Sequence, residues 1–460
     1  MIKALINLLA ISFIFANPLL KSQEGIYNSN LNSAESKIYT LDECIKIALE
    51  KNPDYKLATQ KINISNAYLR TMKGQYFPSA DFSASYNRQL INFDAETMSF
   101  MGQVFQIPGQ EPNSFSTGIS VNYNLFDGFN RSNNYKKAEL NLHSTEYNAK
   151  AFKNSIIYNV QKSYIDVITK MQEIAIQNEN LILGKNQLED IQAKFEAGVT
   201  HIGTVASQEA DLANREFAIV QAQAGMNNSK LNLLNLMGLP LDTKMDLSIA
   251  SINLSTDTND MKRIIEKYSD TEKNFNDAIS QRYDIQAYSN AIEASKLSLE
   301  SSYSGYYPRL SANAGWNWSN SKLEKFNELS RAYVGASLSI PIFDQFNTSY
   351  QIENAKYEIL QNEAELFKLK QNIQNSISIS LENIKLAYKQ LEISDRALAA
   401  SQKNYDIARE RFNVGNASIT DMITANNALV LSKINRNSAF YNFFLAQKDI
   451  EFQISSNTNY

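Results

Sequence analysis

Residues 115–125, FSTGISVNYNL, alternate between two kinds of side chain. Ile119, Val121 and Tyr123 are apolar or aromatic, and the positions between them hold Ser or Asn. Because successive side chains of a strand point to opposite faces of a sheet, this pattern predicts a strand with one apolar and one polar face. Its length of about ten residues is that of a tilted strand that crosses a membrane.

Three more segments alternate in the same way, and together the four predict two β-hairpins, over 79–126 and 309–342. The polar face carries one charged residue, Asp81, which suits a water-filled lumen. Aromatic residues near the segment ends suit the girdle of a membrane barrel. The side chains that we expect to face lipid are Phe82, Tyr86, Ile119, Val121, Tyr123, Leu310, Trp316, Leu338 and Ile340.

Four strands are too few to close a barrel, and open sheet edges are not tolerated in lipid. The shortfall predicts a homotrimer whose three chains together supply a 12-stranded β-barrel. A soluble β-sandwich would show the same alternation. The small number of strands, and their position between long helical segments, disfavour that alternative.

The chain repeats itself. Phe126 and Phe195 recur as Phe343 and Phe412, each 217 positions later (343 minus 126; 412 minus 195). A constant offset over such a span predicts a two-fold internal repeat. We place repeat 1 at 40–238 and repeat 2 at 271–455.

Each repeat is expected to hold a lead-in helix, a hairpin, a long helix and a return helix. The long helices are predicted over 132–195 and 349–411, and the return helices over 202–237 and 419–454. Apolar residues recur every seven positions in the long helices, a spacing that supercoils helices against each other. The fold class is therefore mainly α with membrane β, with the coiled-coil helices forming an α-barrel. A soluble or surface-exposed structural coiled coil would explain the helical stripes equally well.

The remaining segments are short. An apolar run after Lys3 predicts a signal peptide at 1–22, although an uncleaved anchor has the same appearance. An N-terminal extension follows at 23–39, an equatorial linker or collar lies at 239–270, and a tail at 456–460.

Composition disfavours several function classes. The formal net charge of −4 argues against a nucleic-acid partner. With 2 His and 1 Cys, a His/Cys metal cluster is nearly excluded and no cofactor is expected. No nucleotide-binding loop or catalytic triad is present, so we expect no enzyme activity.

Several motifs occur in order across both repeats: 39–53 (YTLDECIKIALEKNP), 76–78 (YFP), 124–128 (NLFDG), 341–344 (PIFD) and 411–415 (RFNVG). Through them the chain resembles the TolC family of outer membrane efflux proteins, over residues 40–455. The resemblance implies a trimer in the outer membrane of a Gram-negative-type cell, with a large periplasmic portion. It implies that the protein is the exit duct of an efflux or type I secretion system and conducts drugs or proteins passively. The implied partners are a periplasmic adaptor protein, an inner-membrane ABC or proton-driven pump, and outer-membrane lipid.

The resemblance also suggests site residues. The family docks its adaptor at the turns between long and return helices, which implies that role for Gly198, Val199, Val414 and Gly415. Glycine merely ending a helix is the simpler alternative.

The family also places an acidic residue at the entrance, and Asp421 matches it. Three copies would form a ring of carboxylates, unless Asp421 is simply a solvated helix residue. Thr204 is its counterpart in repeat 1. The family's latch tyrosine falls at Phe412 and its latch cation at Ala417, so no salt-bridge latch is expected. We expect packing, Asp421 or His201 to hold the entrance closed; His201 is a candidate pH-sensitive group, or only an exposed tip residue.

Overall fold

The structure, a computed structural model, describes residues 37–91, 95–107, 109, 111–249, 258–326 and 328–454. The chain divides into a small unit (1–38 with 244–246) and a large one (39–243 with 247–460). Strands β1 (Lys37–Tyr39) and β6 (Met245–Leu247) pair with each other. The expected signal peptide and the tail at 456–460 lie outside the described residues, as does most of the N-terminal extension.

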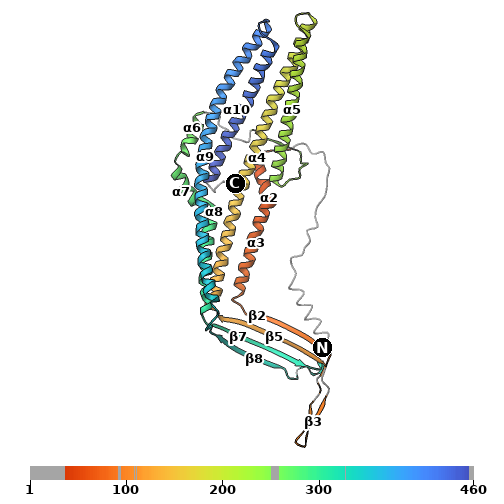
Figure 1. The fold of residues 1–460 in the computed structure, drawn as a ribbon, viewed down its shortest axis with the longest axis vertical. Helices are drawn as coiled ribbons and strands as arrows, with labels where there is room; N and C mark the ends of the chain where they lie inside the picture. Colours follow the sequence, from red (N-terminus) through yellow and green to blue (C-terminus); the bar gives the residue numbers. More distant parts are fainter. Residues whose placement is uncertain are drawn as a thin grey trace. The chain divides into compact units, whose positions relative to one another are not determined.

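The two halves of the large unit repeat one order of elements (Figure 1). The first half holds α2 (Leu41–Lys51), α3 (Pro53–Gly74), β2 (Ser79–Arg88), β5 (Asn113–Phe126), α4 (Asn130–Glu196) and α5 (Ile202–Met237). After α6 (Thr258–Lys267), the second half holds α7 (Thr271–Gln281), α8 (Tyr283–Ser302), β7 (Arg309–Asn320), β8 (Arg331–Ser339), α9 (Asn347–Asn413) and α10 (Ile419–Ile454). Helices α4 and α9 each have 67 residues, about 100 Å at a rise of about 1.5 Å per residue. None of the described helices is both long and apolar enough to span a bilayer.

The expectation of one continuous lead-in helix in each repeat is wrong. In repeat 1 the helix breaks at Asn52, because the ring of Pro53 disfavours helical geometry in the preceding residue. Asn52 stabilises the break by accepting a hydrogen bond from the Tyr55 N–H and donating one to the Leu236 carbonyl. In repeat 2 the break is at Arg282, whose guanidinium pairs with Asp284.

The four long strands form one antiparallel sheet in the order β2-β5-β7-β8. Its register aligns apolar positions in rows: Phe82 lies opposite Ile119, and Ile119 opposite Trp316. A bulge between Asn124 and Phe126 shifts the register, so that Phe126 rather than Leu125 lies opposite Leu310. Strand β8 ends at Ser339, so Ile340 lies just beyond the strand in which it was expected.

One of the aromatic residues near the strand ends, which we expected to be exposed in a girdle, is covered by a loop. Trp318 is 2% exposed, because the loop after β7 covers it. Its Nε1–H donates to the Lys325 carbonyl, and its ring packs on Phe326 with centroids 5.0 Å apart.

The loop between β2 and β5 contains a second, smaller hairpin that the sequence patterns did not predict. Its strands are β3 (Glu96–Phe100) and β4 (Gln103–Ile107), which pair antiparallel.

Each long helix starts at a matching corner. The carboxylate of Asp127 accepts from the Arg131 N–H at 3.1 Å, and that of Asp344 accepts from the Thr348 N–H at 2.8 Å. Hydrogen bonds to Thr348 hold the pKa of Asp344 below its usual value. The residue that starts each helix, Phe129 or Phe346, has a left-handed backbone conformation. The Phe-Asp motif found in both repeats is therefore a strand-to-helix corner.

The heptad stripes form the core between the helices. Val160 and Val167 on α4, and Ile377 and Ile384 on α9, are fully buried. Towards the turn that joins α4 to α5 the side chains of the stripe are more exposed to solvent, and Phe195, near the end of α4, is exposed.

Candidate functional site

The turns at the ends of the two helical hairpins have the same geometry. Gly198 and Gly415 have φ of +72° and +77°, a conformation that costs glycine little. Val199 donates its N–H to the Lys194 carbonyl at 2.8 Å, and Asn416 to the Arg411 carbonyl at 2.7 Å. The glycines therefore do end helices. The same turns leave Val199 and Val414 as exposed apolar side chains at the extremity of each hairpin.

The helices that leave these turns start differently. Ser418 and Asp421 form a capping box: the Asp421 N–H donates to Ser418 Oγ at 3.1 Å, and Ser418 donates to Asp421 Oδ2 from its N–H and its hydroxyl. The Ser418 hydrogen bonds hold the pKa of Asp421 below its usual value, so this carboxylate is ionised at neutral pH. Ser418 was not among the predicted site residues, although Ser three positions before an acid is the signature of such a box.

Repeat 1 lacks this device. His201 and Thr204 take the places of Ser418 and Asp421, and His201 makes no side-chain cap. The Thr204 hydroxyl instead accepts a hydrogen bond from the Thr200 hydroxyl at 3.1 Å. His201 is exposed.

Phe412 belongs to the apolar packing between the hairpins. It lies half-buried against a cluster of buried side chains from all four helices: Ile191, Val205, Tyr405, Ile419, Met422, Ala425 and Leu429. Lys194 Nζ lies 5.8 Å from the centroid of its ring, a cation–π arrangement. Beside it is a cavity of about 210 Å³, lined on α4 by Gln187 and Asp190.

A buried polar network lies behind this cluster, and the sequence patterns missed it. Arg215 on α5 is 3% exposed and Asp211, one turn earlier, is 5% exposed. Arg215 Nε donates to Asp211 Oδ2 at 2.6 Å, Nη1 donates to the Asn180 carbonyl at 2.7 Å, and Nη2 donates to Gln187 Oε1 at 3.1 Å. The Arg215 side chain is accommodated because residue 184 is Gly: a Cβ there would lie 2.9 Å from Arg215 Cδ.

The network also joins the two hairpins. Gln187 on α4 donates to the Tyr405 hydroxyl on α9 at 3.1 Å, and Asn426 on α10 donates to Asn180 Oδ1 on α4 at 2.9 Å. These bonds tie the α9/α10 hairpin to the α4/α5 hairpin. One sequence signal could have indicated these hydrogen bonds. Asn180 and Gln187 are polar residues next to the apolar heptad positions Leu181 and Leu188.

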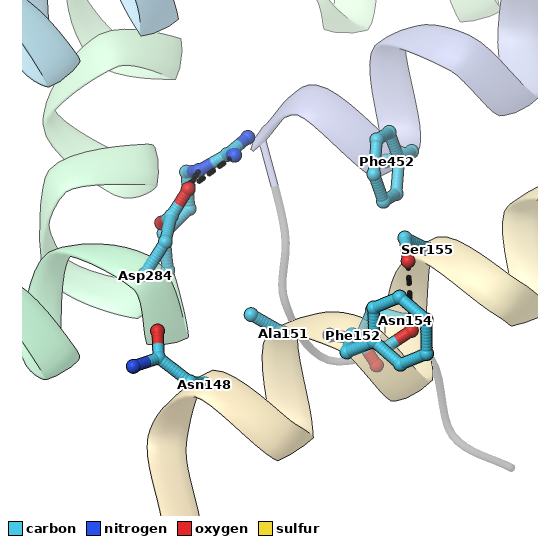
Figure 2. A pocket seen from close by; sticks show the side chains of 8 residues that line it. Asn148, Ala151, Phe152, Asn154, Ser155, Asp284 and Phe452 are labelled. Carbon is cyan, nitrogen blue, oxygen red and sulfur yellow. Dashed lines mark hydrogen bonds and ion pairs between the residues drawn. The ribbon is translucent and has the colours of Figure 1, made fainter. Parts of the chain in front are cut away.

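A second cavity, of about 330 Å³, lies beside the helix break at Arg282 (Figure 2). Asn148, Phe152 and Asn154 of α4 line it, together with Arg282, Asp284 and Phe452. The guanidinium of Arg282 pairs with Asp284 and donates to the Gln453 carbonyl. Among the described residues, no group of His, Cys, Asp and Glu could hold a metal ion.

The chain matches the family described as "Outer membrane efflux protein" over residues 44–239 and 274–449, one segment in each repeat. It belongs to that family. As an outer membrane efflux protein it is a channel component located in the outer membrane, in a family of channels rather than enzymes. The alternative of a soluble coiled-coil protein is not favoured.

Curated relatives and solved structures agree with this assignment. The chain is 24% identical to the cation efflux system protein CusC of Escherichia coli O157:H7, over 90% of this chain and 86% of that one. It is 20% identical to the outer membrane protein TolC of Vibrio cholerae, over 88% of each. Its fold resembles the Campylobacter jejuni CmeC outer membrane channel, with a TM-score of 0.73 at 17% identity, covering 95% of this chain and 94% of that one.

Proposed function

We propose that three copies of this chain close into one continuous duct, through which a tripartite pump discharges its cargo passively to the cell exterior. The sheet supports this assembly. Strands β2 and β8 are its two edges, and among the described residues each has one side without a paired strand. In lipid an unpaired edge is costly, and pairing β8 with β2 of a neighbouring copy removes every edge when three copies form a ring.

The helices support the same ring. Helix α9 carries a stripe of exposed apolar residues every seven positions, at Ile379, Leu386, Ile393, Ala400 and Ile407. This stripe is separate from the buried one that contains Ile377 and Ile384. A second sustained heptad stripe indicates a second helical neighbour.

A matching apolar surface lies on α5, at Phe217, Val220 and Leu231. Helices α9 and α5 are the outer members of the row α9, α10, α4, α5 (Figure 1). Two different complementary surfaces at opposite ends of one layer make a head-to-tail contact, and such contacts form a ring when the rotation between copies closes. The unpartnered stripe on α9 is the observation on which the trimeric duct chiefly rests.

The tip residues would serve as the pump-side end of the duct. We assign adaptor docking to the turns with Gly198, Val199, Val414 and Gly415, whose valines are exposed and whose backbones are rigidly set. The adaptor would link the duct to an inner-membrane pump, ABC-type or proton-driven, because the chain has no motif for using chemical energy itself. Efflux of small molecules and export of proteins are both compatible with a lumen of small polar side chains.

The stripe gives a direct test of the assembly. Replacing Leu386 and Ile393 with Glu should abolish trimers in detergent and single-channel conductance in bilayers, because six carboxylates would be buried between helices. Lys385→Glu is the matched control. It adds a carboxylate one residue away, where Lys385 now pairs only with exposed Glu382, and should leave the trimer intact. Intact conducting trimers of the double variant would refute the proposed interface.

We also propose that Asp421 lines the entrance as a ring of three carboxylates. Asp421→Asn should lower the preference for cations in bilayer recordings, because it removes the charge and keeps an acceptor for the Ser418 cap. Asp421→Ala should lower selectivity equally and in addition cost about 1 kcal/mol of local helix stability. Unchanged ion selectivity in both variants would leave Asp421 with the capping role alone.

A further inference from the structure

The β3–β4 hairpin has an unusual apex. Met101 and Gly102 are its two loop residues, with φ of +51° and +82°, and the flanking residues Phe100 and Gln103 are paired. Positive φ at both positions is the type I′ geometry, which strongly favours Asn-Gly. Methionine is strained there, and its side chain is 91% exposed.

The hairpin is also amphipathic. Met98 and Phe105 lie directly opposite each other and are both exposed. The other face holds the pairs Thr97–Gln106 and Ser99–Val104, and is polar except at the exposed Val104. Residues 97–110 contain no charged side chain. An exposed apolar face beside a polar one indicates a surface that is covered in the working protein.

The other outer loop of the sheet is different in character. Residues 321–330, between β7 and β8, carry four charges, at Lys322, Glu324, Lys325 and Glu328. Lys325 pairs with Glu328 at 3.3 Å, and Lys322 reaches Glu111, just before β5, at 3.9 Å. This charged loop is at the same end of the sheet as the insert between β2 and β5, whose hairpin has one charged residue, Glu96, at the start of β3. Simple exposure to water does not account for both loops.

The apolar face of the sheet continues towards the hairpin. Tyr86 and Phe115, near the outer ends of β2 and β5, stack with centroids 4.8 Å apart. They belong to the face that the proposed function turns to lipid, and the hairpin is inserted between these two strands. Three hairpins meeting over the pore would instead bring apolar surface above a lumen lined by Ser83, Ser85 and Ser116.

We propose that the β3–β4 hairpin anchors the channel mouth in the lipid surface around the barrel, with Met101, Met98 and Phe105 reaching the boundary of headgroups and acyl chains. Its polar face then remains in water, as in other amphipathic interfacial elements. This inference rests on the proposed membrane barrel and goes beyond it, because the duct could conduct without such an anchor.

The test uses full-length channels reconstituted in phosphatidylcholine vesicles, with and without bromine on the acyl chains. Met101→Cys carries an environment-sensitive fluorophore, and Thr97→Cys and Leu323→Cys are controls on the polar face and the charged loop. Burial raises the pKa of Cys44 to about 12, which keeps this thiol from competing for the label. Label at residue 101 should lose emission in brominated vesicles and shift to the blue, label at 97 less so, and label at 323 not at all.

Two outcomes would overturn the anchor. One is equal emission at residue 101 in both kinds of vesicle. The other is ready disulfide formation between Met101→Cys copies within one trimer, since linked Cα atoms lie within about 7 Å and the hairpins would then meet over the pore. Conductance measured on the same vesicles separates either result from failure of the barrel itself.

A second pair of channels tests the apex alone. Phe105→Cys is labelled with and without Met101→Asn, a change that suits the turn better and removes the apolar apex. Quenching at residue 105 should fall in the double variant while conductance stays unchanged. Equal quenching would show that Met101 does not hold the hairpin in lipid.

Discussion

Arg215→Met is expected to destabilise the hairpin ends by about 3–5 kcal/mol, because it strands the carboxylate of Asp211 in a buried site. Asp211 is 5% exposed, and its hydrogen bond from Arg215 Nε is 2.6 Å long. The substitution also removes donors to the Asn180 carbonyl and to Gln187. Methionine retains much of the arginine volume, so the loss would come from the unpaired charge rather than from a cavity.

The measurement should be local, since a detergent-solubilised membrane protein rarely unfolds in one reversible step. Amide hydrogen exchange in α4 and α5 near Asn180 and Asp211 should accelerate, whereas exchange near the collar should not. Asp211→Leu combined with Arg215→Met is the matched control. It replaces the whole pair by apolar groups and should recover most of the protection. A double variant less protected than the single one would contradict this account.

Ile119→Asp is expected to weaken the barrel by about 2–3 kcal/mol per chain, because in the proposed barrel it would place a charge on the lipid face near the middle of the membrane. The register sets its position: Ile119 lies between Phe82 and Trp316 in the same apolar row. In a trimer the effect acts three times. The urea concentration that unfolds the barrel in vesicles should therefore fall markedly.

The strand register also shows which residue on the opposite face of the sheet is the better control for Ile119→Asp. In the proposed barrel Ser120 would face the lumen, but it lies directly opposite Asp81, so a carboxylate there would meet a like charge. Asn122→Asp is cleaner, because its neighbours across the sheet are Ser79 and Asn313. Asn122→Asp should be tolerated. Equal loss of stability in both variants would mean that the two faces of the sheet do not differ in environment.

The features predictable from sequence are those that repeat. The alternation around Ile119 and the heptads through Val160 and Ile377 each extend over many residues, so a single exception does not hide the period. Local breaks of the period were missed. The bulge at Leu125 and the early end of β8 before Ile340 depend on backbone hydrogen bonds that hydrophobicity does not record.

The tip shows the same division. The glycines and the repeat offset located both turns, whereas Asp421 was suggested only by the family resemblance. The sequence did not reveal that the Asp421 carboxylate accepts hydrogen bonds from Ser418, or that Arg215 is buried beside Gly184. An Asp and an Arg one turn apart usually form an exposed ion pair. Here the pair is buried because α4 packs closely against Arg215, which is possible since residue 184 is Gly and has no Cβ.

The unequal starts of α5 and α10 have a consequence for symmetry. A closed trimer presents six hairpin ends that look alike in outline, but only alternate ones carry a fixed negative charge at Asp421 and the other three carry the neutral Thr204. In the proposed trimer the mouth would therefore have six similar hairpin ends but only threefold symmetry in its electrostatic potential. A docking partner built from identical copies would then bind at two chemically different kinds of hairpin end. A cation entering the duct would be attracted only by the three ends that carry Asp421.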